Sequence, residues 1–368
     1  MGLGSGPTST RRGTVEARQL RIGVIGGDGI GPEVVREAIK VLSAVSPPAS
    51  LAFDELPYGA DHTLETGVTL PPGEMERFAR DYDALLLGAL GDPRIPDMRH
   101  AVDILMGARR KLDLYINKRP VRLLQDRLTP LKDRHRGDID LVIFRENTEG
   151  AYAGIGGALK AGTRDEVAVT EMIATWKGTD RIVRAAFEWA RANGRRRVCM
   201  ASKYNAIPHA HGLWARVFRE VSAEFPDIEA TALFADVVAM ELVRDPTRFD
   251  VIVTSNLLGD ILSDLAAQIV GGIGLAPSAN IHPGRTSLFE PVHGSAPDIA
   301  GRGLANPLAA VLTGAMMLRH LDRREDAARV EAAVDRVLHE GSTTPDLGGT
   351  LTTAGVGDAV VEALGRDR

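Results

Sequence analysis

The sequence has little cysteine, no long apolar run and no large excess of one charge, and each shortage excludes a class of protein. Its single cysteine, Cys199, lies in the apolar run 198–201, which predicts a core residue, excludes an intramolecular disulfide and favours a cytoplasmic location. No segment approaches the roughly 18 consecutive apolar residues of a membrane span. The 49 acidic and 44 basic residues give a formal charge of −5 and are spread along the chain, so neither nucleic acid nor an anionic membrane is an expected partner.

The length and composition of the chain give a first estimate of its domains. At 368 residues, with 44% hydrophobic and 25% charged residues, the chain is long enough for two cores. Residues 1–19 contain no apolar signal region and are expected to form a disordered leader. The chain also lacks a Gly-x-x-x-x-Gly-Lys-Ser/Thr string, which excludes a P-loop phosphate-binding module.

Strand-like and helix-like segments alternate along most of the chain, which predicts an α/β fold. Helical periodicity is clearest in residues 33–45 and 180–192. The glycine-rich segment 151–175 breaks the alternation and is more typical of a β-hairpin arm that pairs with a second subunit. The expected strands are residues 20–25, 84–87, 141–144, 198–200 and 251–254.

Two carboxylates one helical turn apart, Asp260 and Asp264, follow the strand-like run 249–254. This spacing places both on one face of a helix, at the end of a buried strand where open α/β sheets bind ligands. Such oxygen ligands suit Mg²⁺ or Mn²⁺. Asp236 is a third candidate ligand, and the alternative is that Asp260 caps the helix while Asp264 is merely solvated.

Three arginines near the ends of expected elements, Arg109, Arg119 and Arg145, are candidates for a clamp that binds carboxylates. Helical spacing places an apolar strip on the same face as Arg109, formed by Val102, Leu105 and Met106. The alternative for each arginine is a structural ion pair.

Tyr152 and Lys203 are the acid–base candidates. A lysine near cations and a metal can act as a base, and a tyrosine can return a proton. The alternative for Lys203 is an ordinary solvated side chain.

The cofactor pattern differs from a Rossmann fingerprint. Residues 26–32, GGDGIGP, follow a strand and open a helix, but their glycines lack the G-x-G-x-x-G spacing. A second loop, residues 290–301, carries Asp298 at its centre. An acid there would accept hydrogen bonds from ribose hydroxyls and repel a 2′-phosphate, so Asp298 favours NAD over NADP.

Together these segments resemble the β-decarboxylating dehydrogenases, the family of isopropylmalate, isocitrate, homoisocitrate and tartrate or D-malate dehydrogenases. The resemblance runs from about Arg21 to the C-terminal region and rests on five segments in order: GDGIGPE, ARRKLDLYINKRP, RENTEGAY, SNLLGDILSD and EPVHGSAPDIAGRGLANP. It implies an α/β fold of two domains with a non-Rossmann dinucleotide site. One domain would comprise residues 20–114 and 271–368, and the other residues 115–270 with the arm.

The resemblance also implies roles for individual residues in a homodimer with shared active sites. Arg109, Arg119 and Arg145 would hold the carboxylates of a small hydroxy acid, and Tyr152 would protonate the product. Asp260 and Asp264 would bind the metal with the partner subunit's Asp236, and the partner subunit's Lys203 would act as the base. The cofactor would contact Ile30, Asn205, His293, Gly294, Ser295, Ala296, Asp298, Ile299 and Asn306.

The substrate expectation rests on the apolar Leu105 and Met106, which favour a 3-alkylmalate, with 3-isopropylmalate first. RENTEGAY and the residues after it look closer to the tartrate and D-malate enzymes, and an isocitrate- or homoisocitrate-type enzyme is a further alternative. Arg99 and His100 could add charge to the pocket, and Lys118 stands where the family commonly has leucine or valine. A non-catalytic member is disfavoured because the full set of acid–base and metal residues is present.

Overall fold

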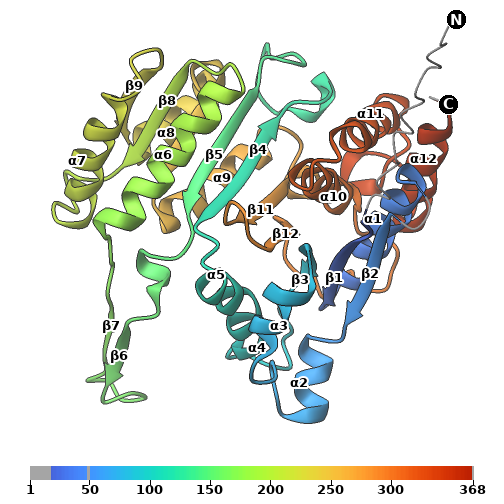
Figure 1. The fold of residues 1–368 in the computed structure, drawn as a ribbon, viewed down its shortest axis with the longest axis horizontal. Helices are drawn as coiled ribbons and strands as arrows, with labels where there is room; N and C mark the ends of the chain where they lie inside the picture. The colour runs from blue at the N-terminus through green and yellow to red at the C-terminus, as the bar shows by residue number, and fades with distance from the viewer. Residues whose placement is uncertain (1–17, 48–49, 367–368) are drawn as a thin grey trace, which may run out of the picture.

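The computed structural model describes residues 18–47 and 50–366. The predicted leader therefore lies outside the described residues, apart from Arg18 and Gln19. Described strands and helices alternate over most of the chain, which confirms the α/β prediction (Figure 1).

One sheet of ten strands runs through the described part of the molecule, in the order β2-β1-β3-β12-β11-β4-β5-β10-β8-β9. The two outer parts of the sheet are parallel, whereas β11 is antiparallel to β12 and β4, and β4 is antiparallel to β5. All five expected strands are present, namely β1, β3, β5, β8 and β10. The strands are β1 (Leu20–Gly27), β2 (Leu51–Leu56), β3 (Ala84–Ala89), β4 (Ile116–Arg122), β5 (Asp140–Glu146), β8 (Arg197–Ser202), β9 (Glu229–Phe234), β10 (Val251–Thr254), β11 (Pro277–Ile281) and β12 (Ser287–Pro291).

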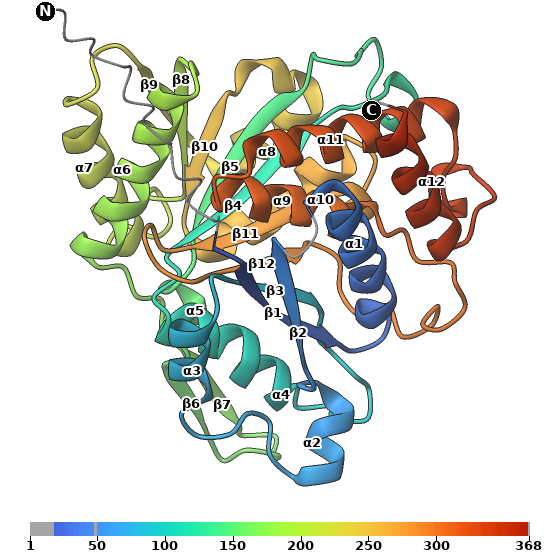
Figure 2. The ribbon, with the colours of Figure 1, turned by 45° about the vertical axis from the view of Figure 1, so that its right-hand side comes forward.

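Helices cover both faces of this sheet (Figures 1 and 2). The first of them, α1, shows why the sequence forms helix here. Pro32 fits its first turn and apolar residues recur at helical spacing, so one face packs into the core. The helices are α1 (Gly31–Val45), α2 (Ala60–Thr66), α3 (Glu74–Asp81), α4 (Arg99–Ala101), α5 (Gly107–Lys111), α6 (Trp176–Ala192), α7 (Ala210–Ser222), α8 (Ala235–Arg244), α9 (Asn256–Gln268), α10 (Leu308–His320), α11 (Arg324–Glu340) and α12 (Thr353–Gly365).

The segment before Arg109 differs from the regular helix that its spacing predicts. Residues Val102–Met106 form a π-helical turn, η1, between α4 and α5, and the amide of Gly107 bonds to the carbonyl of Val102 five residues back. The π-helical turn contains one more residue than an α-helical turn, which changes the angular spacing of the side chains on this segment.

The predicted arm is a β-hairpin. Strands β6 (Gly156–Leu159) and β7 (Val167–Thr170) pair antiparallel, and every residue of both strands is exposed. Figure 1 shows the hairpin reaching away from the main sheet. None of the described helices combines the length and the apolar character that crossing a membrane requires.

Candidate active site

A cleft of about 340 Å³ opens between the carboxyl ends of β3 and β12, the η1–α5 segment, and helix α9. Ten of the residues predicted from the sequence lie along it. They are Val102, Leu105, Met106, Arg109, Arg119, Arg145, Tyr152, Asp260, His293 and Gly294. The apolar strip and the three arginines therefore share one cleft, despite the π-helical turn between α4 and α5.

The three arginines of the cleft are buried and held by hydrogen bonds. Arg145 is 1% exposed, and its Nε donates to Asn256 Oδ1 at 2.9 Å. Arg119 donates to Ser263 Oγ at 2.6 Å. These uncharged partners help to fix the guanidinium groups, which also contact the aspartates described below.

Arg109 has both a neutral and an acidic partner. Its Nε donates to Asn280 Oδ1 and one of its terminal nitrogens donates to Glu290 Oε1, each at 3.1 Å. Sequence reasoning assigned no role to Glu290 or Asn280. Glu290 belongs to the EPVHGSAP segment, but nothing in that segment indicates that its carboxylate meets an arginine 181 residues away.

Gathering these cations in one buried place has an electrostatic cost. Burial lowers the pKa of Arg145, and the nearby charges of Arg119 and Arg109 lower that pKa further, only partly offset by Asp260. Burial likewise lowers the pKa of Arg119. An anionic ligand would relieve this repulsion, so the cleft suits a substrate with carboxylates.

Asp260 and Asp264 lie one turn apart on α9, and each contacts an arginine. Arg145 lies 2.5 Å from Asp260 Oδ1, and Arg119 lies 3.0 Å from Asp264 Oδ1. The Asp260 and Asp264 side chains remain 38% and 57% exposed. Both carboxylates therefore keep surface through which a cation could be bound.

The charge environment of the two aspartates differs. Burial raises the pKa of Asp260, but Arg145 and Arg119 outweigh burial and hold that pKa below its usual range. Burial raises the pKa of Asp264, and Arg119 offsets only part of this effect. Two acidic oxygen donors on one helical face fit a hard divalent cation. Within the described ranges, no three His, Cys, Asp or Glu side chains gather closely enough to hold a metal, so one chain supplies two of the three predicted ligands together.

Tyr152 lies beside this pair, on the short turn η3 (Ala151–Ala153). Its hydroxyl donates to Asp260 Oδ2 at 2.9 Å, and the Arg145 guanidinium lies 5.5 Å from the centre of its ring. Burial, followed by the contact with Asp260, raises the pKa of Tyr152. A protonated phenol is thus placed next to the carboxylate-binding arginines.

Lys203 and Asp236 lie elsewhere, at the carboxyl ends of β8 and β9. Lys203 Nζ donates to Asp236 Oδ1 at 2.7 Å, and neither residue lines the cleft of its own chain. Asn205 is exposed at the same end of β8. The structure therefore groups Lys203 with Asp236, but apart from the other predicted catalytic and metal residues.

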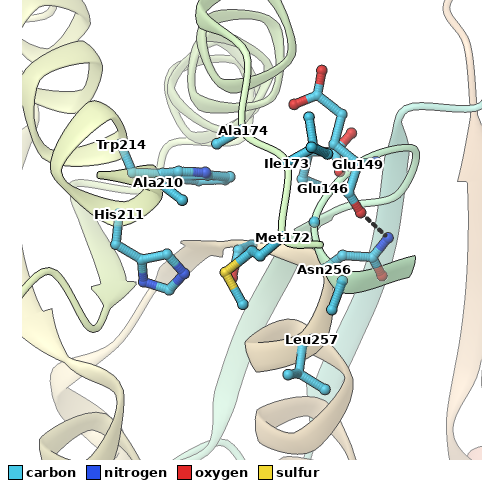
Figure 3. A pocket seen from close by; sticks show the side chains of 13 residues that line it. Glu146, Glu149, Met172, Ile173, Ala174, Ala210, His211, Trp214, Asn256 and Leu257 are labelled. Carbon is cyan, nitrogen blue, oxygen red and sulfur yellow. Dashed lines mark hydrogen bonds between the residues drawn. The ribbon is translucent and has the colours of Figure 1, made fainter. Parts of the chain in front are cut away.

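A small cavity next to Lys203 contains a residue that sequence reasoning missed. His211 is 2% exposed, and its Nδ1 accepts a hydrogen bond from the backbone N–H of Lys203 at 2.8 Å. Figure 3 shows the His211 ring and Met172 at this cavity, and Asn256 donating to the Glu149 carbonyl. With about 10 Å³ of free space, the cavity has room for about one water and not for a substrate.

The predicted cofactor loop contacts the GDGIG segment directly. The amide of Ile30 donates to the carbonyl of Ser295 at 2.8 Å. Gly29 has a φ of +57°, and a Cβ at that position would lie 2.0 Å from the same carbonyl, so only glycine allows this approach.

The remaining residues of that loop are arranged around an exposed acid. Asp298 is exposed, and its carboxylate has no hydrogen bond or ion pair in the described part of the chain. Ile299 bonds to Ala296 through its amide at 3.1 Å, and the Asn306 side chain donates to Asp346 Oδ2 at 3.0 Å. The loop therefore offers a free carboxylate on an ordered backbone.

Three residues suggested as modifiers of the pocket do not line the cleft. His100 is fully buried, and its Nε2 lies 2.8 Å from Asp28 Oδ2, while Arg99 is exposed outside the cleft. Lys118 alternates with Arg119 along β4 and so points to the opposite face of the sheet. These three residues were expected at the pocket because they are close in sequence to residues that line it. Side chains alternate along a strand and point in different directions around a helix, so neighbours in sequence need not share the cleft.

Comparison with known proteins identifies the family to which the chain is similar. The sequence model described as isocitrate/isopropylmalate dehydrogenase matches residues 21–360. A 3-isopropylmalate dehydrogenase of Thermobifida fusca is 45% identical over 354 residues, which cover 95% of this chain and 99% of that protein. One of Frankia casuarinae is 49% identical over 319 residues, covering 86% and 91%. The crystal structure of an isocitrate dehydrogenase from Methylococcus capsulatus matches with a TM-score of 0.86 and 38% identity, covering 94% of this chain and 99% of that one.

Proposed function

The chain belongs to the isocitrate/isopropylmalate dehydrogenase family, and we propose that it oxidises and decarboxylates a 3-substituted malate, with 3-isopropylmalate as the first candidate. The observation that carries the substrate proposal is the cleft that joins three buried arginines to the apolar strip of Val102, Leu105 and Met106. The arginines would bind two carboxylates, and the strip would receive an alkyl group on C3.

The balanced reaction removes a hydride from C2 and a proton from the C2 hydroxyl, then breaks the bond between C3 and its carboxylate to release CO₂. NAD, when bound, supplies the hydride acceptor, and Mg²⁺ or Mn²⁺ supplies Lewis-acid polarisation of the substrate oxygens. The chain's own side chains hold the carboxylates and move the protons. Tyr152, whose hydroxyl donates to Asp260, would return a proton to C3 after CO₂ has left.

The base that takes the hydroxyl proton would be the partner subunit's Lys203. In each chain Lys203 pairs with Asp236 outside the cleft, so the two residues could enter a neighbouring cleft together. There the partner subunit's Asp236 would complete the metal site with Asp260 and Asp264. This arrangement would explain why one chain contains all the acid–base residues but does not bring them together in its own cleft.

A homodimer would also cover apolar surface that is exposed in one chain. Met240 and Val243 on α8 are 62% and 50% exposed, and Ile261 on α9 is 60% exposed. Leu159 of the arm is 70% exposed. Exposed apolar side chains of this size on α8, α9 and the arm support association with a second copy.

Asp298 supports NAD as the cofactor, because its unpaired carboxylate could accept hydrogen bonds from a ribose. The predicted division of the chain is part of the same proposal. Residues 20–114 with 271–368 would bind the cofactor, and residues 115–270 would bind the metal and dimerise. A cytoplasmic location remains a prediction from the single buried cysteine.

A substrate panel tests the proposal. Purified protein is assayed with NAD and Mn²⁺ on 3-isopropylmalate, D-malate, tartrate, isocitrate and homoisocitrate, following absorbance of the reduced cofactor. We expect the highest kcat/KM for 3-isopropylmalate. A wide preference for tartrate, D-malate or isocitrate would overturn the alkyl-pocket proposal, and no turnover of any of the five would contradict the proposed substrate class.

A further inference from the structure

We propose that a second groove, on the face of the sheet opposite the cleft, binds a small aliphatic carboxylate. The groove measures about 420 Å³, within the usual range of small-molecule sites of about 300–1,000 Å³. Pro120 and Arg122 of β4 lie along it. Because side chains alternate along a strand, these two residues point away from the face that carries Arg119.

Four other elements form the apolar walls of the groove. Ala267 comes from the last turns of α9, Pro277 from the start of β11, Leu312 and Met316 from α10, and Ala332 from α11. Figure 1 shows α10 and α11 beside β4, with α6 on the other side of β4 and β5. The groove thus lies between β4, the start of β11 and the helices α9, α10 and α11.

The acids around the groove already have cationic partners. Asp140 bonds to Arg195 at 2.6 Å, and Glu331 pairs with Arg319 at 2.7 Å. Asp335 pairs with Arg136 at 2.9 Å. These acidic groups are therefore not free to bind a cationic ligand.

Arg122 is the charged residue that remains available. It is exposed, and its guanidinium has no hydrogen bond or ion pair to any part of the chain that the structure describes. An apolar groove with one unpaired guanidinium complements an aliphatic chain that ends in a carboxylate, because arginine can bind that group through two parallel hydrogen bonds.

The same features exclude the substrate class of the cleft. A hydroxy di- or tricarboxylate would place its further carboxylates against the apolar walls or near Asp140, Glu331 and Asp335, where no unpaired positive charge would balance them. An alkylammonium would be repelled by Arg122, and a neutral alcohol would lack the charge-assisted bond. The ligand is therefore a monocarboxylate with an unbranched or branched aliphatic body.

Binding of hexanoate tests the proposal by titration calorimetry, independently of turnover. Hexan-1-ol and hexylammonium serve as probes with the same chain and a different head group. We expect saturable binding of hexanoate that weakens at least about tenfold in Arg122→Met, the loss expected for a charge-assisted pair. Ala332→Trp, a change at an exposed position, should abolish binding by filling the groove.

Two controls separate this groove from other binding. Arg36→Met removes an exposed arginine of α1 that has no ion pair within residues 18–47 and 50–366, and it should leave hexanoate binding unchanged. Arg109→Ala damages the cleft and should also leave it unchanged. Loss of hexanoate binding in Arg109→Ala but not in Arg122→Met would overturn the proposal, as would equal binding of the three probes or the absence of saturable binding.

Discussion

At the scale of single residues, the cleft is defined by how its charges are balanced. Arg109, Arg119 and Arg145 are buried together, and each has an acidic partner among Glu290, Asp264 and Asp260. Asp260 and Asp264 are partly exposed, whereas Glu290 and the three arginines are buried. If a divalent metal engages Asp260 and Asp264, Arg119 and Arg145 become available for substrate carboxylates. The aspartates that now pair with the arginines would thus prepare the site for a metal and a carboxylate together.

Asp298 should determine the choice of cofactor. We expect kcat/KM to favour NAD over NADP by at least about tenfold, roughly 1.4 kcal/mol, because the carboxylate repels a 2′-phosphate and accepts hydrogen bonds from the ribose. Asp298→Asn should reduce this ratio. The exposed Asp133→Asn is a matched control that should leave the ratio unchanged. Equal efficiency of the unmodified protein with both cofactors would contradict this prediction.

Leu105 should determine how well the C3 substituent binds. Leu105→Ala removes a branched side chain from the apolar strip, so KM for 3-isopropylmalate should rise by the equivalent of roughly 1 to 3 kcal/mol. D-Malate has no alkyl group at C3, and its KM should change little. A similar rise for both substrates would mean that Leu105 supports the cleft as a whole rather than the alkyl group.

At the scale of elements, the π-helical turn η1 has the clearest consequence for the site. An ordinary helix would separate Val102 and Arg109 by two turns on nearly the same face. The π-helical turn rotates the preceding residues, yet Val102, Leu105 and Met106 still line the cleft with Arg109. Apolar periodicity predicted which residues share the cleft, but no residue type in VDILM indicates the extra residue in the turn.

Strand β4 carries charged side chains on both faces. One of them, Lys118, should lower the stability of the folded state. Lys118 lies behind the cleft with its Nζ 4.7 Å from the centre of the Trp189 ring. Burial, with a smaller contribution from the charge of Arg319, lowers the pKa of Lys118 to about 8. The folded state therefore disfavours the charged lysine, despite the attraction of the ring.

We predict that Lys118→Met raises the free energy of unfolding at pH 7 by about 1 to 3 kcal/mol. For a lysine whose pKa is lowered from 10.5 in the unfolded chain to about 8 in the folded chain, the cost is fully present below pH 8. It disappears as the pH rises to 10.5, so the benefit of the substitution should disappear over the same interval. Urea unfolding at several pH values measures this, with the exposed Lys132→Met as a control. A benefit that is independent of pH would show that methionine acts through packing alone.

At the scale of the whole molecule, the sequence predicted the parallel parts of the sheet better than its centre. Continuous apolar runs such as Val251–Thr254 mark strands that are buried on both faces, and these were predicted correctly. β4 contains Asn117, Lys118 and Arg119, and β11 contains Asn280, so polar and charged residues interrupt the apolar pattern. The antiparallel centre was missed for that reason.

The sequence identified candidate residues for the site but not how they are arranged in space. Spacing placed Asp260 and Asp264 together, because both lie on one helix. The Lys203–Asp236 pair and the His211 contact join different elements, and no local pattern encodes such a distance. Their roles in a shared site stay a prediction.

Subunit exchange tests that shared site. Lys203→Met and Arg109→Ala proteins should each be inactive alone, because one loses the base and the other loses a carboxylate ligand. A mixed dimer would contain one site with both defects and one intact site, so mixing should restore activity to a quarter of the wild-type value at most, on statistical grounds. Light scattering and exchange of a fluorescent label establish that mixed dimers form. If they form and stay inactive, each chain must supply its own lysine.

The measurement that tests the central claim most directly is the ratio of CO₂ to NADH formed from 3-isopropylmalate by the purified protein with NAD and Mn²⁺. We predict one CO₂ for each NADH, and the loss of both products when EDTA removes the metal. NADH formation without CO₂ would contradict decarboxylation, and undiminished formation of both products in EDTA would contradict the metal site at Asp260 and Asp264.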